Sequence, residues 1–535
     1  MIKIIKRLIL ISTAFVFASC TKDLVEVNTN PYAANSIDPA LLFSGAQRTH
    51  LGNWTAEHTI VQQFVVPYNT GANVGFNFNE DIDGVSIPKW DQSYALGANN
   101  PNGSPNNYAP IKNYIQAINL LGSTTTRVNL LCMLRIWKAQ VFMGLVDTYG
   151  DVPYSEAGKG VSDALFYPKY DDDAVIYDNL YKEIKEATAA LTPTGDYVSS
   201  DLFYGTNGHT STRTTTAAAQ VPKWKKLGYS LLLRLGMRYS KVNAAKAQTI
   251  VAEALAGGVM TSNADNAFVK YDGTIFTELD NAVLRNFSQF NYAAEPFVNY
   301  LKSTNDPRGR FILANFPNPG NVNATPNPDT VLANQFGVPI GVTDAQITAA
   351  GSPYRGARSG GLNYSQMNVW TVASPAAPDF YVTYASTALL LAEAAKRGWI
   401  PGGDAAAKTY YESAIAADIA TYTLYPGTSA VSGSEVSAYI NSASVLYNPT
   451  DALKLINNQY WIVNLRNGTE AFANFRRSGF PVLSPNLFNN KLNGGFVRRL
   501  TYPDAEASAN TTNYQAASAA IGGDKLTVRV FWDTP

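Results

Sequence analysis

The sequence predicts a mainly α-helical protein in which a helical scaffold carries an inserted loop-rich, irregular region with few short strands. Along several long segments, apolar residues recur every three or four positions, as they do on one face of a helix. By contrast, residues 259–380 are rich in Gly, Pro and Asn and show no sustained helical period. We expect the scaffold to comprise 39–258 and 381–480, and the irregular, ligand-side region to comprise 259–380 and 481–535.

The first twenty residues have the pattern of an export signal. Three basic residues precede the apolar run Leu8–Ala18, which is too short to cross a bilayer and is followed by small residues. The sequence FASC then resembles the lipobox of bacterial lipoproteins, with Phe17 where leucine is usual and Cys20 as the residue that would be lipidated. The chain thus divides into three expected parts: a signal peptide at 1–19, a lipidated tether at 20–38 and a single domain at 39–535.

The domain is predicted to begin with a helix over 40–66. Asp38 can cap this helix, and Pro39 suits its first position. Residues 67–110 are loop-rich, and a second helix is predicted over 113–121. A short polar link then leads into the central helix.

The central helix, up to Tyr149, is expected to be buried. Its apolar residues fall on two stripes, so that it is apolar almost all round: Leu130, Leu134, Trp137, Val141 and Leu145 on one, and Ile136, Ala139, Met143 and Val146 on the other. Gly150 can end the helix in a left-handed conformation, and Pro153 prevents it from continuing.

The later helices are predicted from the same spacing and from their end signals. The acidic run 171–173 could bind calcium, but it lacks the spaced ligands of a calcium loop, and we interpret it as the start of a helix that runs to about 191. A helix over 384–397 and its partner over 405–421 look like a tetratricopeptide unit. The other predicted elements are helices over 224–238, 244–256, 451–465 and 468–477 and a terminal strand over 527–531.

Five segments of the chain resemble, in order, motifs of one protein family. They are NTNPYAANSIDPALLFSGAQ at 28–47, DTYGDVPYSEA at 147–157, DLFYG with LLLRLGMR between 201 and 238, YASTALLLAEAAKRGW at 384–399 and NGGFVRRLTYPDAEASANTTN at 493–513. The family is SusD/RagB, whose members are surface lipoproteins of Gram-negative bacteria. The chain departs from the pattern at Tyr229, where asparagine is common, and in a longer Thr-rich insertion at 206–220.

The resemblance implies a function in nutrient uptake. Members of the family bind a nutrient and deliver it to a SusC-like TonB-dependent transporter in the outer membrane. It implies for this chain a lipid-anchored position at the cell surface, an oligosaccharide or possibly a peptide as ligand, and no enzymatic activity. Two alternatives stay open, a surface glycoside hydrolase that acts on the same glycans and a structural scaffold that binds no ligand.

Composition and motifs argue against several other classes of protein. The formal net charge is +0 and only 15% of residues are charged, which excludes nucleic-acid binding by a basic surface. The three histidines, His50, His58 and His209, show no metal-binding spacing, and Cys132 falls in the helix predicted to be buried. No nucleotide or hydrolase motif occurs. We therefore expect no metal and no other cofactor.

Paired carboxylates for glycoside hydrolysis cannot be judged from spacing in the sequence, because they meet only in the folded chain. Glu393, Glu470 and Glu506 are the acids within motifs or helices. We interpret them as ion-pair partners on helices, with Arg397 or with arginines from the set Arg476, Arg477, Arg498 and Arg499.

A sugar site needs an exposed aromatic ring beside polar groups, since the C–H face of a sugar stacks on the ring while its hydroxyls form hydrogen bonds. Two loops combine such residues, and the candidates are Tyr68, Phe76 and Phe78 in one loop and Tyr354, Arg355, Tyr364 and Trp370 in the other. Packing in the core is the alternative for each ring. Residues 271–300 are the next candidates, whereas Trp90 and Tyr94 are expected to be core because of their helical spacing.

Overall fold

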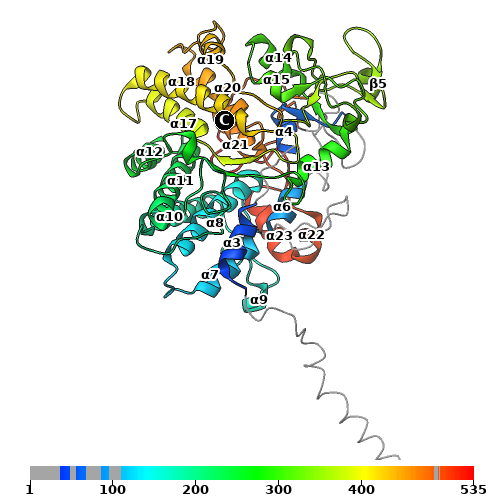
Figure 1. Ribbon diagram of the computed structural model, residues 1–535. Coiled ribbons are helices and arrows are strands. Elements are labelled where there is room, and N and C mark those ends of the chain that lie inside the picture. Colours follow the sequence, from blue (N-terminus) through cyan, green and yellow to red (C-terminus); the bar gives the residue numbers. More distant parts are fainter. Residues whose placement is uncertain (1–36, 49–55, 68–85, 95–109, 487–491, 493) are drawn as a thin grey trace, which may run out of the picture.

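The structure is a computed structural model that describes residues 37–48, 56–67, 86–94, 110–486, 492 and 494–535. Figure 1 shows packed helices on one side of the molecule and a loop-rich part at the upper right. The scaffold helices are α3 (Pro39–Gln47), α4 (Ala56–Ile60), α6 (Pro88–Tyr94), α7 (Pro110–Leu121), α8 (Val128–Tyr149), α9 (Gly160–Asp163), α10 (Asp173–Ala190), α11 (Ala217–Arg238), α12 (Ala244–Gly257), α17 (Tyr384–Lys396), α18 (Gly403–Thr421), α19 (Gly433–Ile440), α20 (Ala452–Val463) and α21 (Gly468–Ser478). The predicted mainly α fold is confirmed.

Helix α8 is the centre of the scaffold, as its apolar stripes predict. It is long and apolar enough to span a membrane, but 72% of its most apolar stretch is buried within the protein, which is what a core helix shows. Trp137 is fully buried and makes edge-to-face contacts with Phe203 and Tyr381. The helix ends at Gly150, whose φ of 77° is left-handed and whose N–H donates to the carbonyl of Val146.

The other long helices pack in pairs around α8. Helix α11 packs against α12, α17 packs against α18, and α10 lies against both α8 and α11. Thr383 caps α17 through a reciprocal bond with Ser386, and Gly398, at φ 73°, follows its end. These antiparallel pairs give the scaffold its tetratricopeptide-like form.

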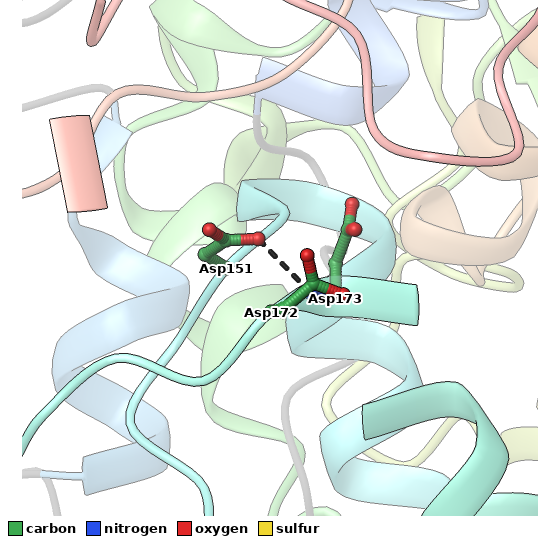
Figure 2. Close-up of side chains that lie close together, drawn as sticks. All are labelled: Asp151, Asp172 and Asp173. Atoms are coloured by element: carbon green, nitrogen blue, oxygen red, sulfur yellow. Dashed lines mark hydrogen bonds between the residues drawn. The ribbon is translucent and has the colours of Figure 1, made fainter. Parts of the chain in front are cut away.

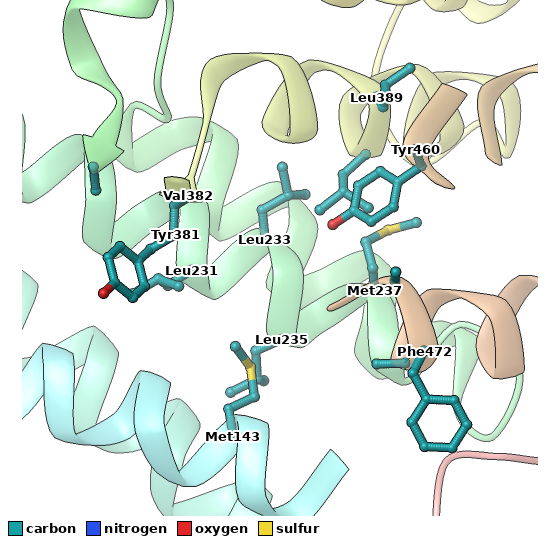
Figure 3. Packing of buried hydrophobic residues seen from close by; sticks show 14 of the residues in the cluster. Met143, Leu231, Leu233, Leu235, Met237, Tyr381, Val382, Leu389, Tyr460 and Phe472 are labelled. Carbon is teal, nitrogen blue, oxygen red and sulfur yellow. The ribbon is translucent and has the colours of Figure 1, made fainter. Parts of the chain in front are cut away.

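The core lies where α8, α11, α17, α20 and α21 meet. Figure 3 shows Met143 of α8 facing Leu235 of α11, and Tyr460 and Met237 close together between α20 and α11. Because these helices come from distant parts of the chain, the core joins the first and last thirds of the sequence.

The region 259–380 is irregular, as predicted. Its helices are α13 (Leu279–Asn286), α14 (Glu295–Ser303), α15 (Gly309–Ile312) and α16 (Asp344–Thr348). Its short antiparallel strand pairs are β1 (Phe64–Val65) with β3 (Tyr292–Ala293), β2 (Ala267–Val269) with β8 (Asp379–Val382), β4 (Leu313–Ala314) with β7 (Gln366–Met367), and β5 (Ala357–Arg358) with β6 (Gly361–Leu362). A small second core of Val65, Tyr292, Ala294, Val338, Ile347, Leu362 and Tyr364 supports these loops.

Three predicted elements differ from the structure. The single helix over 40–66 is wrong, since α3 ends at Gln47 and Phe64–Val65 are a strand. The strand over 527–531 is also wrong, because the chain there is coil and turn and no described strand pairs with it. The part 481–535, expected to be irregular, contains the helices α22 (Asp504–Ala509) and α23 (Thr511–Ala520).

Candidate functional site

Two of the predicted ligand residues, Tyr354 and Arg355, are half-buried just before β5. The backbone N–H of Arg355 donates to the hydroxyl of Tyr364 at 3.1 Å, and its Nε donates to the carbonyl of Asn363 at 3.2 Å. The guanidinium of Arg355 lies 3.5 Å from the ring centroid of Phe336. These contacts hold the arginine in one place, and its two terminal amino groups form no bond with the residues that the structure describes.

Two cations lie close to the ring of Phe336. Its ring is 37% exposed, and the Nζ of Lys302 lies 4.4 Å from the ring centroid, in addition to Arg355. Cations over an aromatic face are attracted by the ring's quadrupole. Phe336 was not among the residues predicted from the sequence, because it stands alone in the polar segment that follows η5 (Leu332–Asn334).

Trp370 is half-buried, with its ring edge fixed and one cation above it. The indole N–H donates to the carbonyl of Thr325 at 3.1 Å, and the guanidinium of Arg285 lies 4.1 Å from the ring centroid. Arg285 itself is held by a 2.6 Å bond from Nε to Asn323 Oδ1. A ring fixed in this way, with hydrogen-bond donors beside it, has the make-up of a sugar-stacking platform.

The remaining predicted aromatics are placed differently. Tyr364 is only 2% exposed and packs in the small second core, so that it offers no ring face to a ligand. Tyr68, Phe76 and Phe78 lie outside the described residues. In the segment 271–300, Phe287 is 43% exposed. Tyr292 is buried, and its hydroxyl oxygen accepts the backbone N–H of Leu362.

A groove of about 400 Å³ runs beside the segment that leads to Phe336. It lies between the end of α14, α15 and α19, and is lined by Thr304, Asn305, Asp306, Pro307, Arg310, Thr330, Val331, Leu332, Glu435, Ala438, Tyr439 and Ser442. The charges in this groove are paired, since Arg310 contacts Glu435 at 2.6 Å and the buried Asp306 contacts Arg308 at 2.6 Å. The groove itself is therefore close to neutral.

Three carboxylates meet where the chain leaves α8 and enters α10. Figure 2 shows Asp151, Asp172 and Asp173, and their oxygens lie within 4.8 Å of one another. Asp172 caps α10 by accepting the N–H of Val175, which confirms the predicted start of this helix. Asp151 accepts the N–H of Asp173 at 2.9 Å, and Asp173 accepts the N–H of Phe531 at 2.8 Å. Burial raises the pKa of Asp151 to about 6 and that of Asp173 to about 7. These bonds explain the cluster as a joint between three segments of the chain.

The acids considered for catalysis are engaged in the scaffold. Glu393 pairs with Arg397 and, in two bonds of 2.7 Å, with Arg477, as predicted. Glu470 pairs instead with Arg234 and Arg238 of α11, which lay outside the predicted set. Glu506 accepts a bond from the hydroxyl of Tyr170 at 2.8 Å.

The fold defines a class of binding proteins in which a tetratricopeptide-like scaffold carries a loop-rich ligand region. A family model described as "Starch-binding associating with outer membrane" matches residues 32–503, and the chain belongs to this SusD-like family. Members of the family bind nutrients or glycans at the outer membrane. A search of curated protein sequences gives no match.

Solved structures of the same fold cover nearly all of the chain. One is a chitin-binding protein that is 27% identical, with a TM-score of 0.74 over 93% of this chain and 100% of the other. A SusD-like structure from Bacteroidetes is 24% identical, with the same TM-score and coverage. A SusD-like protein from Bacteroides thetaiotaomicron is 20% identical, with a TM-score of 0.69 over 93% of this chain and 99% of the other.

Proposed function

We propose that this protein is a cell-surface lipoprotein that binds a soluble oligosaccharide and delivers it to a SusC-like TonB-dependent transporter in the outer membrane. Family membership supports binding at the outer membrane. The family description names starch, and a 27% identical structure is that of a chitin-binding protein, which favours an oligosaccharide over a peptide. The transporter as partner follows from the likeness to SusD proteins.

The proposed ligand site is the loop region that contains Tyr354, Arg355 and Trp370, together with the loop 68–79. The observation that carries this proposal is Trp370, a half-buried indole whose N–H donates to the carbonyl of Thr325 and whose ring lies beside the guanidinium of Arg285. When a sugar stacks on the indole, Arg285 can turn its donors to the sugar hydroxyls. The rings of the scaffold are by comparison largely buried in its core.

Binding without turnover separates this function from its two alternatives. The full chain is titrated by calorimetry with soluble oligosaccharides of starch, chitin and other glycans, and each mixture is then chromatographed. The proposal expects that at least one oligosaccharide binds and is recovered intact. Shortened products would support a surface glycoside hydrolase, and binding of none of them would support a structural scaffold.

Cys20 is proposed to be the lipidated first residue of the mature protein. Two acyl chains anchor a protein stably, whereas a single chain holds it only marginally. We expect Cys20→Ala to move the protein from the membrane fraction to the soluble fraction. Fractionation of the cells, with protease treatment of intact cells for surface exposure, measures this. If Cys20→Ala protein stays in the membrane fraction and remains exposed to protease, the anchor lies elsewhere.

A further inference from the structure

Most arginines in the described residues contact a carboxylate, but three neighbouring cations of the loop-rich part do not. On the scaffold, the buried arginines Arg238 and Arg477 each contact a carboxylate within 4 Å. In the loop-rich part, Lys302, Arg355 and Arg358 contact no carboxylate among the described residues, and we call these three the basic patch. Three neighbouring cations without a carboxylate partner in the described part of the chain form a place where an outside anion can bind.

The three cations are held close together by shared neighbours. Arg355 and Lys302 lie at 3.5 and 4.4 Å from the centroid of the same ring, that of Phe336. Arg358 donates from one terminal nitrogen to Asn315 Oδ1 at 3.0 Å and to Asn363 Oδ1 at 3.4 Å, and Asn363 also accepts from Arg355. The patch is thus built around one ring and one asparagine.

The donors of the patch are only partly used. Lys302 donates to the carbonyls of Ala333 and Gln335 at 3.0 and 2.7 Å. Arg355 donates through its backbone N–H and its Nε, while its two terminal amino groups have no bond to the described residues. Burial lowers the pKa of Lys302, and the charge of Arg355 lowers it further, because the two cations repel each other. A bound anion would relieve this repulsion.

The chemistry of these donors selects the anion. A guanidinium presents two parallel N–H groups that match the oxygens of a carboxylate or a sulfate, and such charge-assisted bonds are stronger than neutral ones. Starch and chitin, named by the family description and by a similar structure, carry no charge. They therefore give the basic patch nothing to bind.

We propose that the basic patch of Lys302, Arg355 and Arg358 binds an acidic group, a carboxylate or a sulfate, on the oligosaccharide that this protein captures. The inference rests on the proposed function and narrows its substrate class to acidic glycans. The groove of about 400 Å³ is lined by Thr330, Val331 and Leu332, and residues 333–336, which contact Lys302, follow directly in the chain. The groove offers room for neighbouring sugars of the same oligosaccharide.

The test compares charged and neutral probes on the full chain by calorimetry. The probes are a galacturonic acid hexasaccharide, which carries carboxylates, a sulfated galactose hexasaccharide, an N-acetylglucosamine hexasaccharide and a hexaglutamate peptide. We expect one of the two acidic oligosaccharides to bind at least about ten-fold more tightly than the neutral one. Its affinity should fall as sodium chloride rises from about 50 to about 500 mM, because salt screens exposed charges. Which acidic probe binds identifies the carboxylate or the sulfate.

Variants of single cations locate the effect. Arg355→Gln and Arg358→Gln should each weaken binding of the acidic oligosaccharide by about ten-fold. The melting temperature of each variant protein should stay close to that of the wild type, since neither arginine is fully buried. Arg127→Gln is the matched control, because Arg127 is also only partly exposed but lies on the scaffold, away from the groove, and is paired with Asp38. This control should bind as the wild type does.

Four results would overturn the inference: equal affinity for the neutral probe, unchanged affinity in both Arg355→Gln and Arg358→Gln, tighter binding of hexaglutamate than of any oligosaccharide, or binding of no probe. Binding of the neutral probe alone would leave the proposed function standing and remove only the acidic substrate class. Binding of no oligosaccharide, neutral or acidic, would remove both.

Discussion

Arg238→Gln is expected to lower the free energy of unfolding by about 5 kcal/mol, the largest effect of any substitution considered for this protein. Arg238 is 0% exposed and joins three helices. It donates to Asp147 of α8 at 3.1 Å and to Glu470 of α21 at 2.7 Å. Burial alone would lower the pKa of Arg238, but the charges of Asp147 and Glu470 raise it well above its usual value. Glutamine would leave both carboxylates in the core with one balancing charge fewer.

Urea unfolding at neutral pH measures the loss. Lys408→Gln is the control, because Lys408 forms an exposed ion pair with Glu412 one turn along α18, and it should cost less than about 0.5 kcal/mol. If Arg238→Gln is as stable as this control, the buried carboxylates find other partners, and the account of the core as an ion-paired joint of α8, α11 and α21 is wrong.

Glu393→Gln is expected to lower the free energy of unfolding by about 4 kcal/mol. Here the substitution removes a negative charge and leaves a buried arginine, instead of buried carboxylates, without its partner. Glu393 and Arg477 are both fully buried and share two bonds of 2.7 Å, and Asn457 donates to the same carboxylate at 3.2 Å. The glutamine side chain keeps the shape but removes the charge, so that Arg477 is left buried without a counter-ion. Glu412→Gln, in the exposed pair on α18, is the matched control.

The pH dependence provides a second readout for Glu393. Burial alone would raise its pKa, but Arg477 and Arg397 lower it to about 2. A carboxylate whose pKa is lower in the folded protein stabilises the fold at pH values above its ordinary pKa of about 4.3. This stabilisation is lost as the pH falls from there toward about 2. The difference in unfolding free energy between wild type and Glu393→Gln should therefore be constant above about pH 5 and shrink below about pH 4. A difference that stays constant down to pH 3 would contradict the ion pair.

These ion pairs explain what the recognisable motifs of the sequence do. Asp147, Arg238, Glu393 and Glu470 each fall in a segment singled out in the sequence. In the structure Arg238 joins Asp147 to Glu470 in the core, and Glu393 forms a separate buried pair with Arg477. The interpretation of the motif acids as ion-pair partners is confirmed for Glu393. The choice of partners for Glu470 was wrong because sequence spacing reports neighbours on one helix, whereas Arg238 reaches Glu470 across 232 residues.

Elements set by local signals were predictable, and those set by distant pairing were not. Helix α8 and the exit at Gly150 follow from periodicity and from one glycine. By contrast, the helix predicted over 40–66 fails because Phe64–Val65 pair with Tyr292–Ala293, a contact that no local pattern reveals. Alternation at 527–531 predicts a strand only if a partner is present, and instead the N–H of Phe531 bonds to Asp173.

The candidate site was predictable only in part, for a related reason. Aromatic residues in loops were a usable signal for Trp370 and for the Tyr354–Arg355 pair. Burial was not readable, and Tyr364 packs inside because its neighbours Tyr292 and Val338 come from other segments. The cations Arg285 and Lys302 were missed because they reach the rings of Trp370 and Phe336 from helices α13 and α14.

The central claim is that ligand binds on the loop-rich part at Trp370 while the helices serve as scaffold, and Trp370→Ala tests it most directly. Trp399 provides the control, because it is also half-buried and also lies under an arginine, Arg397 at 5.3 Å, but on the scaffold. Calorimetry with the oligosaccharide that the wild type binds most tightly, and melting temperatures for all three proteins, make the comparison. We expect Trp370→Ala to weaken binding by about 1 kcal/mol or more and Trp399→Ala to bind as the wild type does, at similar stability. Unchanged binding by Trp370→Ala, or an equal loss in both variants, would contradict the claim.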